Sequence, residues 1–410
     1  MSAMSHVHTP PLKLTVADVM APAAVQGWQR RAGILAVVAA LASLLGFFLN
    51  QQEFFPSYLL GFMLCLGAAF GSLGMLMVSH LSGGRWAVVL RRPFEAAAQT
   101  MPVLAVLFIP IWLGRTVLYA WSRPADVARD SGLQHLRGYL NLPWVTTRAG
   151  IYFFVWIVIT RILVRYSNQQ DAGQGGTPLK HRLENVSGVG LLLGCITISF
   201  AAIDWVMSLL PAWSSSIFGL IVLAGEGLTT IALMVILCSK LAQIAPFNRI
   251  YTRQRFHELG KWMLMFVLLF AYFSFSQLLI IWSGNIPDEI KFYLLRINAG
   301  WLAVTLLFVI GHFALPFALL LSSSLKKKAG KLALLAAFIL CMRWVELYWL
   351  VFPNVAGHAH LNWQNVTVPL ALGSVWVVAF LHFLRQRPLL PLLDPQMDEI
   401  LREASGAKAH

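Results

Sequence analysis

The sequence predicts an all-α integral membrane protein with ten transmembrane helices, and three observations support this prediction. Hydrophobic residues make up 58% of the 410 residues and charged residues only 12%, whereas a soluble domain is about 25% charged. Long apolar stretches recur along the chain, and basic residues gather between alternate stretches. This composition excludes a soluble enzyme, a disordered tail protein and a disulfide scaffold.

Each apolar stretch is long enough to cross a hydrocarbon core of about 30 Å, which takes about 20 helical residues. Because unpaired backbone groups are costly in lipid, these stretches should be helices. The third is the least regular, since Pro102, Pro110 and Arg115 lie inside it. The expected spans are 31–49, 58–81, 97–121, 149–165, 188–210, 215–240, 260–284, 293–321, 332–352 and 366–384.

The net charge of +14 indicates topology rather than nucleic-acid binding, because most basic residues fall on one side of the predicted membrane. The positive-inside rule then places both termini in the cytoplasm, as an even number of spans requires. The run Lys326–Lys328 is expected to contact anionic phospholipid. The basic residues near the two ends are Lys13, Arg30, Arg31, Arg385, Arg387, Arg402 and Lys408.

Four short matches, in the same order, relate one half of the chain to the other. They predict two parallel four-helix bundles, spans 2–5 and 6–9, related by an axis along the membrane normal, with spans 1 and 10 beside them. The matches are Ser57–Phe62 with Ser215–Leu220, Ile111–Gly114 with Ile281–Gly284, Arg148 with Arg296, and Asp204 with Glu346, the last two acids each standing seven residues before a proline. The expected units are 1–30 as a cytoplasmic segment, 31–57 as span 1 with its outer loop, 58–210 and 211–353 as the bundles, 354–384 as an outer loop with span 10, and 385–410 as a cytoplasmic tail.

Two carboxyl groups lie inside predicted spans, where an ionisable side chain is costly and is by default a functional candidate. Asp204 is expected in the outer third of the membrane, and Glu226 near its midplane. Each shares a helical face with hydroxyl groups, so each is a candidate to hold and pass on a proton. The alternative is that each acid is neutral or hydrogen-bonded and only holds helices together. The hydroxyl groups belong to Thr197 and Ser208 beside Asp204, and to Thr229 and Thr230 beside Glu226.

Other polar and aromatic residues extend this set. His312, in the cytoplasmic half of the eighth span, is a candidate proton relay or a neutral hydrogen-bonded histidine. Arg343 and Glu346 lie three residues apart on one helix, so we expect a structural ion pair. Gln277 is polar at outer depth. Tryptophans at the outer helix ends are typical of an aromatic belt and also offer a wall for a flat hydrophobic headgroup; they include Trp205, Trp213 and Trp282.

The four cysteines stand alone in separate spans, at positions 65, 195, 238 and 341. Isolated positions lack the paired spacing of zinc, iron–sulfur or covalent haem sites. The sequence therefore predicts that this chain holds no metal and no redox centre of its own.

Several motifs together resemble a known family. They are Asp204–Leu209 with Pro211, Trp213, Ser214, Ile217, Phe218 and Gly219; Tyr139–Asn141 with Arg148, Tyr152, Phe153 and Trp156; Phe275–Gln277, Ile281–Trp282 and Asn285–Glu289; His312–Phe313 with Pro316–Phe317; and Pro391–Pro395. In these motifs the sequence is similar to the polysulfide-reductase-like membrane subunits of alternative complex III, a quinol:electron acceptor oxidoreductase. The resemblance covers nearly the whole chain, from about residue 30 to 400, and favours the smaller of the two such subunits.

The resemblance implies a cofactor-free membrane subunit in the bacterial inner membrane, with no catalytic residues of its own. Quinol or menaquinol would be oxidised at the complex, with haem c and iron–sulfur clusters on partner subunits. The implied partners are the sister polysulfide-reductase-like membrane subunit, an iron–sulfur subunit, c-type cytochrome subunits, small membrane subunits and phospholipids, without nucleic acid. Among the matching positions Asp204 is implied to carry protons; Glu226 and His312 are added on depth and polarity.

Two other functions are compatible with the sequence. A secondary transporter would also contain an internal repeat and buried acids. A purely structural assembly scaffold would keep the same residues for helix packing alone.

Overall fold

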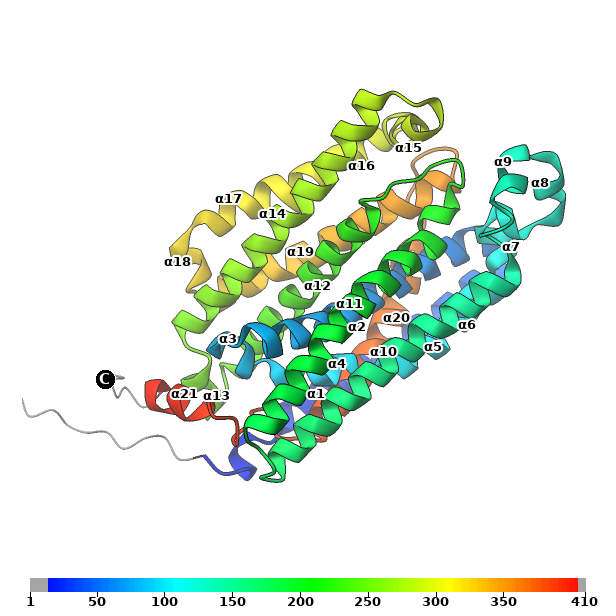
Figure 1. Ribbon diagram of the computed structural model, residues 1–410. Coiled ribbons are helices and arrows are strands. Elements are labelled where there is room, and N and C mark those ends of the chain that lie inside the picture. The colour runs from blue at the N-terminus through cyan, green and yellow to red at the C-terminus, as the bar shows by residue number, and fades with distance from the viewer. Residues whose placement is uncertain (1–13, 405–410) are drawn as a thin grey trace, which may run out of the picture.

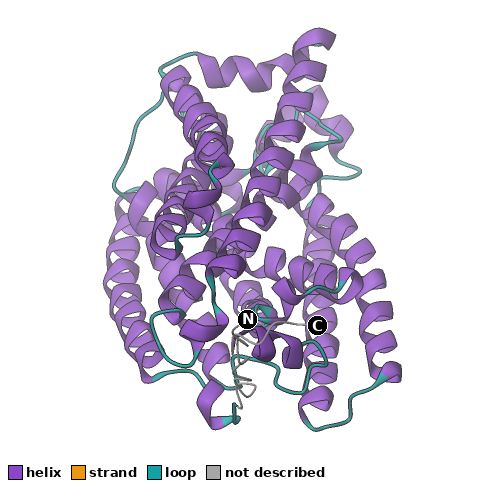
Figure 2. Cartoon of the chain, turned by 90° about the vertical axis from the view of Figure 1, so that its left-hand side faces the viewer, coloured by secondary structure: helices purple, strands orange, loops and turns teal. Residues whose placement is uncertain are grey.

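The computed structural model describes residues 14–404, which form helices joined by loops and contain no strand (Figures 1 and 2). Ten helical segments in this range are long and apolar enough to cross a membrane. The chain is therefore an all-α, multi-pass membrane protein. Lys13 and Lys408, which contribute to the predicted topology, lie outside the described residues.

The long helices run side by side along one direction (Figure 1). The membrane-spanning elements are α1 (Ala23–Leu49), α2 (Gln51–Ser82), α4 (Arg91–Ala98) with α5 (Met101–Leu107) and α6 (Ile109–Leu113), α10 (Leu142–Asp171), α11 (Thr177–Trp205), α12 (Phe218–Leu241), α14 (Arg253–Gly284), α16 (Trp301–Phe308) with α17 (Leu315–Leu321), α19 (Ala329–Val351) and α20 (Gln364–Arg385). The connecting helices are α3 (Arg85–Val88), α7 (Arg115–Leu118), α8 (Pro124–Arg129), α9 (Ser131–Leu136), α13 (Phe247–Ile250), α15 (Pro287–Ile297), α18 (Ser323–Lys326) and α21 (Met397–Ala404). Single 3-10 turns occupy Ala17–Val19, Ala120–Ser122, Met207–Leu209 and Phe352–Asn354, and a π-helical turn occupies Val309–Ala314.

The third span differs from the expected 97–121, because it begins at Arg91 and ends at Leu113. It is broken into three short helices, and Pro102 and Pro110 stand in the first turns of the second and third. Proline has no N–H to donate and disfavours a helical conformation at the residue before it. Hydropathy alone missed the helical turns at the start of this span because they carry charged residues.

The eighth span also differs from the expected 293–321. It begins at Trp301, and α15 is a separate helix before it. Ala299 and Gly300 break the chain between the two helices, since both have positive φ angles, 52° and 86°. A helix cannot continue through the left-handed region, so Arg296 lies on α15 and not on the spanning helix.

Helices α2 and α12 form the centre of the bundle. Helix α2 packs against α4, α11, α12 and α20, whereas α12 also packs against α11, α14 and α19. A side chain at Gly71 of α2 would collide with the backbone carbonyl of Glu226 in α12, so glycine is required where these two helices approach. We call α2, α4–α6, α10 and α11 the first helix group, and α12, α14, α16, α17 and α19 the second helix group. The internal symmetry of the two bundles stays a prediction.

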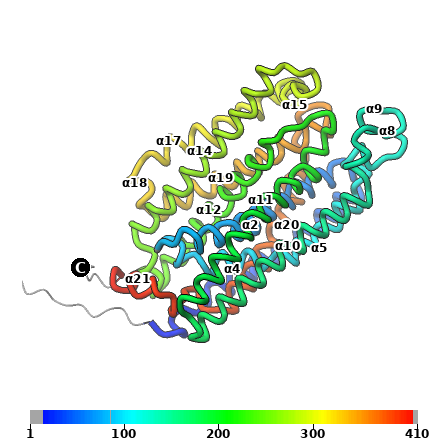
Figure 3. The backbone as a smooth tube through the Cα atoms, viewed as in Figure 1, coloured from blue at the N-terminus to red at the C-terminus, as the bar shows by residue number. Residues whose placement is uncertain are grey.

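The two ends of the described chain lie at the same end of the bundle, where α21 is found (Figure 3). The Leu389 amide donates to the Val19 carbonyl at 2.8 Å, which joins the C-terminal segment to the N-terminal one. The small helices α8 and α9 and the helix α15 lie at the opposite end (Figure 3), which we call the α15 end.

Candidate functional site

Asp204, at the end of α11 in the first helix group, is fully buried. Arg148 of α10 donates from Nε and Nη2 to its two carboxylate oxygens, each at 2.8 Å. Tyr152, one turn along α10, donates its hydroxyl to the same carboxylate at 2.8 Å. Arg148 also donates to the Tyr139 carbonyl at 3.2 Å and lies over the Tyr139 ring. This bidentate ion pair fixes the position of the Asp204 carboxylate.

Aromatic rings fill the space around this ion pair. Trp205 is buried, and its ring centroid lies 4.7 Å from that of Phe108 and 5.8 Å from that of Phe153. Phe62 and Trp156 complete the cluster, with centroids 5.8 and 6.2 Å from that of Trp205. Trp205, a predicted quinone-pocket residue, thus lies in a closed aromatic core.

The two hydroxyl groups predicted to accompany Asp204 form local contacts. The Trp156 indole nitrogen donates to Thr197 Oγ1 at 2.9 Å, and the Thr197 hydroxyl in turn donates to the Leu193 carbonyl at 2.7 Å. Ser208 donates to the Asp204 backbone carbonyl at 2.6 Å. Neither hydroxyl therefore hydrogen-bonds the Asp204 carboxylate.

A second buried cluster joins α12, α19 and the π-helical turn in the second helix group. Arg343 pairs with the carboxylate of Glu346, one turn along α19, and donates from Nε to Thr229 Oγ1 at 3.1 Å. His312 Nε2 lies 3.0 Å from the same Glu346 oxygen, at an angle that leaves the nitrogen without a well-aligned hydrogen bond. One carboxylate therefore faces both an arginine and a histidine.

His312 occupies the π-helical turn that interrupts the eighth span. A π turn adds one residue to a helix and is frequent at functional sites. The His312 ring centroid lies 4.4 Å from that of Phe270 on α14. A side chain at Gly311 would collide with Met342, so the turn approaches α19 closely. The turn thus brings His312 against Glu346.

Glu226 lies in the middle of α12 and is 2% exposed. Neither of its carboxyl oxygens has a hydrogen-bond partner among the residues that the structure describes. The Arg343 guanidinium packs against the neighbouring Gly225, so Arg343 lies between the regions of Glu226 and Glu346. The Thr230 hydroxyl of α12 donates a hydrogen bond to the Gly67 carbonyl of α2 at 3.3 Å. Of the residues predicted around Glu226, Thr229 is the one that contacts Arg343.

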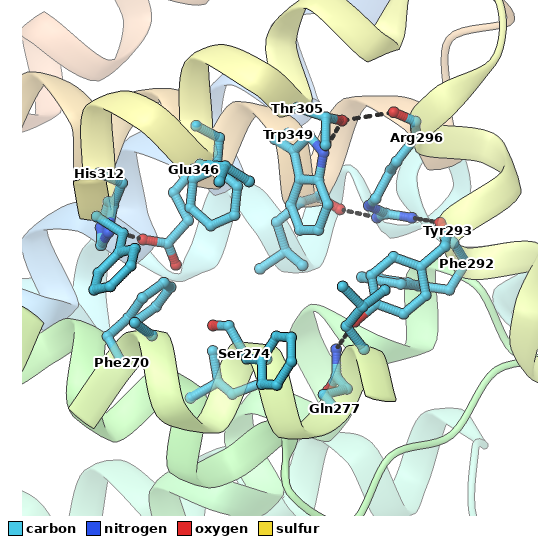
Figure 4. A pocket seen from close by; sticks show the side chains of 18 of the residues that line it. Phe270, Ser274, Gln277, Phe292, Tyr293, Arg296, Thr305, His312, Glu346 and Trp349 are labelled. Atoms are coloured by element: carbon cyan, nitrogen blue, oxygen red, sulfur yellow. Dashed lines mark hydrogen bonds and ion pairs between the residues drawn. The ribbon is translucent and has the colours of Figure 1, made fainter. Parts of the chain in front are cut away.

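A cavity of about 670 Å³ lies in the second helix group beside this cluster (Figure 4). We call it the lateral pocket. Its walls come from α12, α14, α15, α16, the π-helical turn and α19, and they are mostly apolar, with many aromatic side chains. Polar side chains gather at two ends: His312 and Glu346 at one, and Arg296, Tyr293 and Gln277 at the other (Figure 4).

Some of the polar and aromatic residues predicted at outer depth line this pocket, and others lie behind its wall. Gln277 and Trp282 line it. Ser215 donates to Gln277 Oε1 at 2.8 Å, which orients the amide. Trp213 stacks on Phe292, a lining residue, with ring centroids 4.0 Å apart. The pocket therefore brings Gln277 and Trp282 of α14 together with His312 and Glu346, which come from two other spans.

Sequence reasoning did not place Arg296 or Tyr293 in a site, whereas Trp349 was among the outer tryptophans expected to offer a wall for a flat headgroup, and it lines the pocket. Arg296 and Tyr293 reach the pocket because α15 is a separate helix that contacts the end of α19, which the span pattern does not reveal. One signal was present: Arg296 matches Arg148 in the internal comparison, and the Arg148 side chain makes the principal ion pair of the first helix group.

No family model and no curated protein matches this chain. Within residues 14–404, no three or more His, Cys, Asp or Glu side chains come together as a possible metal site. The cysteines at positions 65, 195, 238 and 341 are free thiols. The candidate site is therefore defined by the lateral pocket and the buried cluster at its wall.

Proposed function

We propose that this chain is an integral membrane subunit of a quinol-oxidising electron-transfer complex, as its resemblance to alternative complex III implies. In this proposal the lateral pocket receives the quinol, and His312 with Glu346 takes up a proton from it. The observation that carries the proposal is a large aromatic pocket in the membrane with a buried histidine–carboxylate pair at its wall.

The size and position of the pocket suit a lipid-soluble ring compound. Ligand pockets range from roughly 300 to 1,000 Å³ and are mostly apolar with a few placed polar groups. Tyr272, Phe275 and Trp282 line the lateral pocket and are also 65%, 63% and 53% exposed on the outer side of α14. In a membrane this surface faces acyl chains or a partner subunit, so the ligand enters sideways from the bilayer.

The polar end at His312 provides a proton acceptor. Oxidation of a quinol releases two protons and two electrons. His312 Nε2 has no well-aligned hydrogen bond, so in its neutral form it can accept the proton of a hydroxyl group. Glu346, 3.0 Å away, stabilises the imidazolium that results. Arg343 and Thr229 connect this pair toward Glu226 in the centre of the bundle.

The electrons leave to partner subunits. In this proposal an iron–sulfur subunit and c-type cytochrome subunits carry the redox centres, next to the sister membrane subunit in a bacterial cytoplasmic membrane. The chain itself supplies the ligand pocket and the proton acceptors.

The proposal is tested by purifying the full chain, with its co-purifying subunits, from its native membrane. We expect c-type haem and iron–sulfur signals in the material, together with quinol oxidation. His312→Gln should lower turnover by about a hundredfold, the usual contribution of a general base. His382→Gln is the matched control, because His382 is exposed on α20 and does not line the pocket. Absence of any redox subunit from the purified material would contradict the assignment to such a complex.

Secondary transport is a second candidate, favoured by the interruption of the eighth span. Transporters often bind substrate where a spanning helix departs from regular geometry, and the π-helical turn is such a departure beside the pocket. Uptake of a solute by the isolated chain in lipid vesicles would support transport. Failure of uptake, with quinol oxidation present in the complex, would support the first proposal.

A further inference from the structure

Arg296, at the α15 end of the lateral pocket, is a fully buried cation with no acidic partner among the described residues. Its guanidinium donates to the carbonyls of Phe292 and Leu350, at 2.6 and 2.9 Å. It also lies over the rings of Phe292 and Trp349, 3.6 and 4.9 Å from their centroids. Among residues 14–404, no carboxylate lies within ion-pair distance of it, and its Nε has no partner.

The other buried arginines that the structure describes all have acidic partners. Arg92 contacts Glu95 and Asp171, Arg255 contacts Glu258 and Glu403, and Arg343 contacts Glu346. Among the buried arginines that the structure describes, Arg296 therefore differs from the others in lacking an acidic partner.

A buried charge is costly unless it is paired. Carbonyl oxygens and aromatic faces compensate a guanidinium only in part, because neither carries a full negative charge. Burial lowers the pKa of Arg296 to about 9, so the side chain remains a cation at neutral pH. An anionic group entering the pocket would therefore gain an interaction that no residue of the site provides.

We propose that Arg296 recognises an ionised oxygen, so that the lateral pocket selects a flat ring compound bound as an anion with that oxygen at the α15 end. This inference rests on the proposed function, and it adds the charge of the ligand and its orientation in the pocket. The remaining polar end, at His312 and Glu346, lies across the aromatic middle of the pocket (Figure 4). It would receive the second oxygen of the ring compound. The ligand class is an acidic hydroxyquinone, or a quinol that has lost one hydroxyl proton.

The test compares two naphthoquinones that differ at one ring substituent, which is charged in one compound and neutral in the other. One carries a hydroxyl group on the quinone ring that is ionised at the pH of the experiment, and the other carries a methoxy group at the same position. Both are added to the full chain in lipid nanodiscs, and binding is followed by quenching of tryptophan fluorescence, since Trp282 and Trp349 line the pocket. We expect the anion to bind at least about tenfold more tightly, as a charge-assisted hydrogen bond implies.

Three variants assign the preference to a residue. Arg296→Gln should abolish it while the methoxy compound still binds, and Arg296→Lys should keep part of it because lysine retains the charge but loses the planar fork. Arg115→Gln is the matched control, since Arg115 also stacks on a tryptophan, Trp112, but does not line the pocket. It should keep the full preference. If Arg296→Gln fails to fold, the comparison of Arg296→Lys with the wild type decides.

The outcomes separate this inference from the proposed function. Equal binding of both compounds to the wild type, or an undiminished preference in Arg296→Gln, overturns the role of Arg296 and leaves the quinone pocket standing. Absence of binding by either compound overturns both. Equally tight binding of an alkyl carboxylate without a ring, lost in Arg296→Gln, would show anion recognition by Arg296 but overturn the choice of a ring compound.

Discussion

The two helix groups use similar charged residues in opposite ways. In the first, Arg148 reaches across from α10 and closes on Asp204, and aromatic rings fill the surroundings. In the second, Glu346 instead pairs with Arg343 and His312, and Arg296 has no acidic partner within residues 14–404. A cavity of about 670 Å³ remains between these charges. A closed ion pair can serve packing alone, whereas separated charges around a cavity leave interactions for a ligand.

The largest expected effect is on stability and follows from removing the Arg148–Asp204 ion pair. Asp204→Ala should lower the free energy of unfolding by roughly 3–5 kcal/mol, because it leaves Arg148 in a mostly buried position without its partner. Denaturation of the purified chain in detergent measures this change. Asp126→Ala is the control, since the Arg123–Asp126 pair is about 40% exposed and should contribute below about 1 kcal/mol. Equal effects of the two variants would show that the buried pair is not a stability element.

The next effect is on activity and separates the two groups. His312→Gln should lower quinol turnover by about a hundredfold with little change in ligand affinity, because the proton acceptor is lost and the pocket is kept. Thr197→Val, in the first group, should leave turnover within about twofold, because Thr197 only accepts from Trp156 and donates to a backbone carbonyl. A larger loss in the Thr197 variant would place proton transfer in the first group.

A smaller effect concerns a contact between α2, in the first helix group, and the loop that follows α19 at the α15 end. His360, in the loop after α19, lies 2.7 Å from Glu53 of α2. Burial disfavours its charged form, but hydrogen bonds to the His358 carbonyl and to Glu53 outweigh this and raise the pKa of His360. The raised pKa contributes stability that is full below about pH 6.5 and is lost as the pH rises through the folded-state pKa.

The stability difference between the wild type and His360→Gln should therefore shrink between about pH 6 and pH 8. It should stay below about 1 kcal/mol at its maximum, because the His360 side chain is 32% exposed and solvent screens the pair. Thermal unfolding at several pH values measures it. A difference that grows with pH would contradict the assigned direction.

The smallest expected effect is at Glu226. Glu226→Gln should change the free energy of unfolding by no more than about 0.5 kcal/mol. Neither carboxyl oxygen has a hydrogen-bond partner among the described residues, and a carboxyl buried without a partner is expected in its neutral form, like the amide that replaces it. Infrared spectroscopy of the same variant should show the loss of a protonated-carboxyl band. A destabilisation above about 1 kcal/mol would mean that Glu226 is ionised and depends on Arg343 for its charge.

Sequence reasoning located the ten spans because hydrophobic length is a local property of the chain. It failed at the third and eighth spans, where charges buried by other helices and the turn at Ala299 and Gly300 decided the boundaries. It also selected His312, Glu226 and the Arg343–Glu346 pair, because ionisable residues within apolar stretches are conspicuous. It could not assign Glu346 to a pocket, since the contact with His312 joins residues of different helices.

The sequence by itself determined that this chain lies in a membrane as a set of helices and that a few ionisable groups are buried among them. Only the tertiary structure decided which of those groups compensate one another. Hydropathy depends on the residues within one helix, but the pairing of a charge depends on which neighbouring helix faces it. For this reason Asp204 forms an ion pair with Arg148, whereas Arg296 lines a cavity and has no acidic partner in the part of the chain that the structure describes.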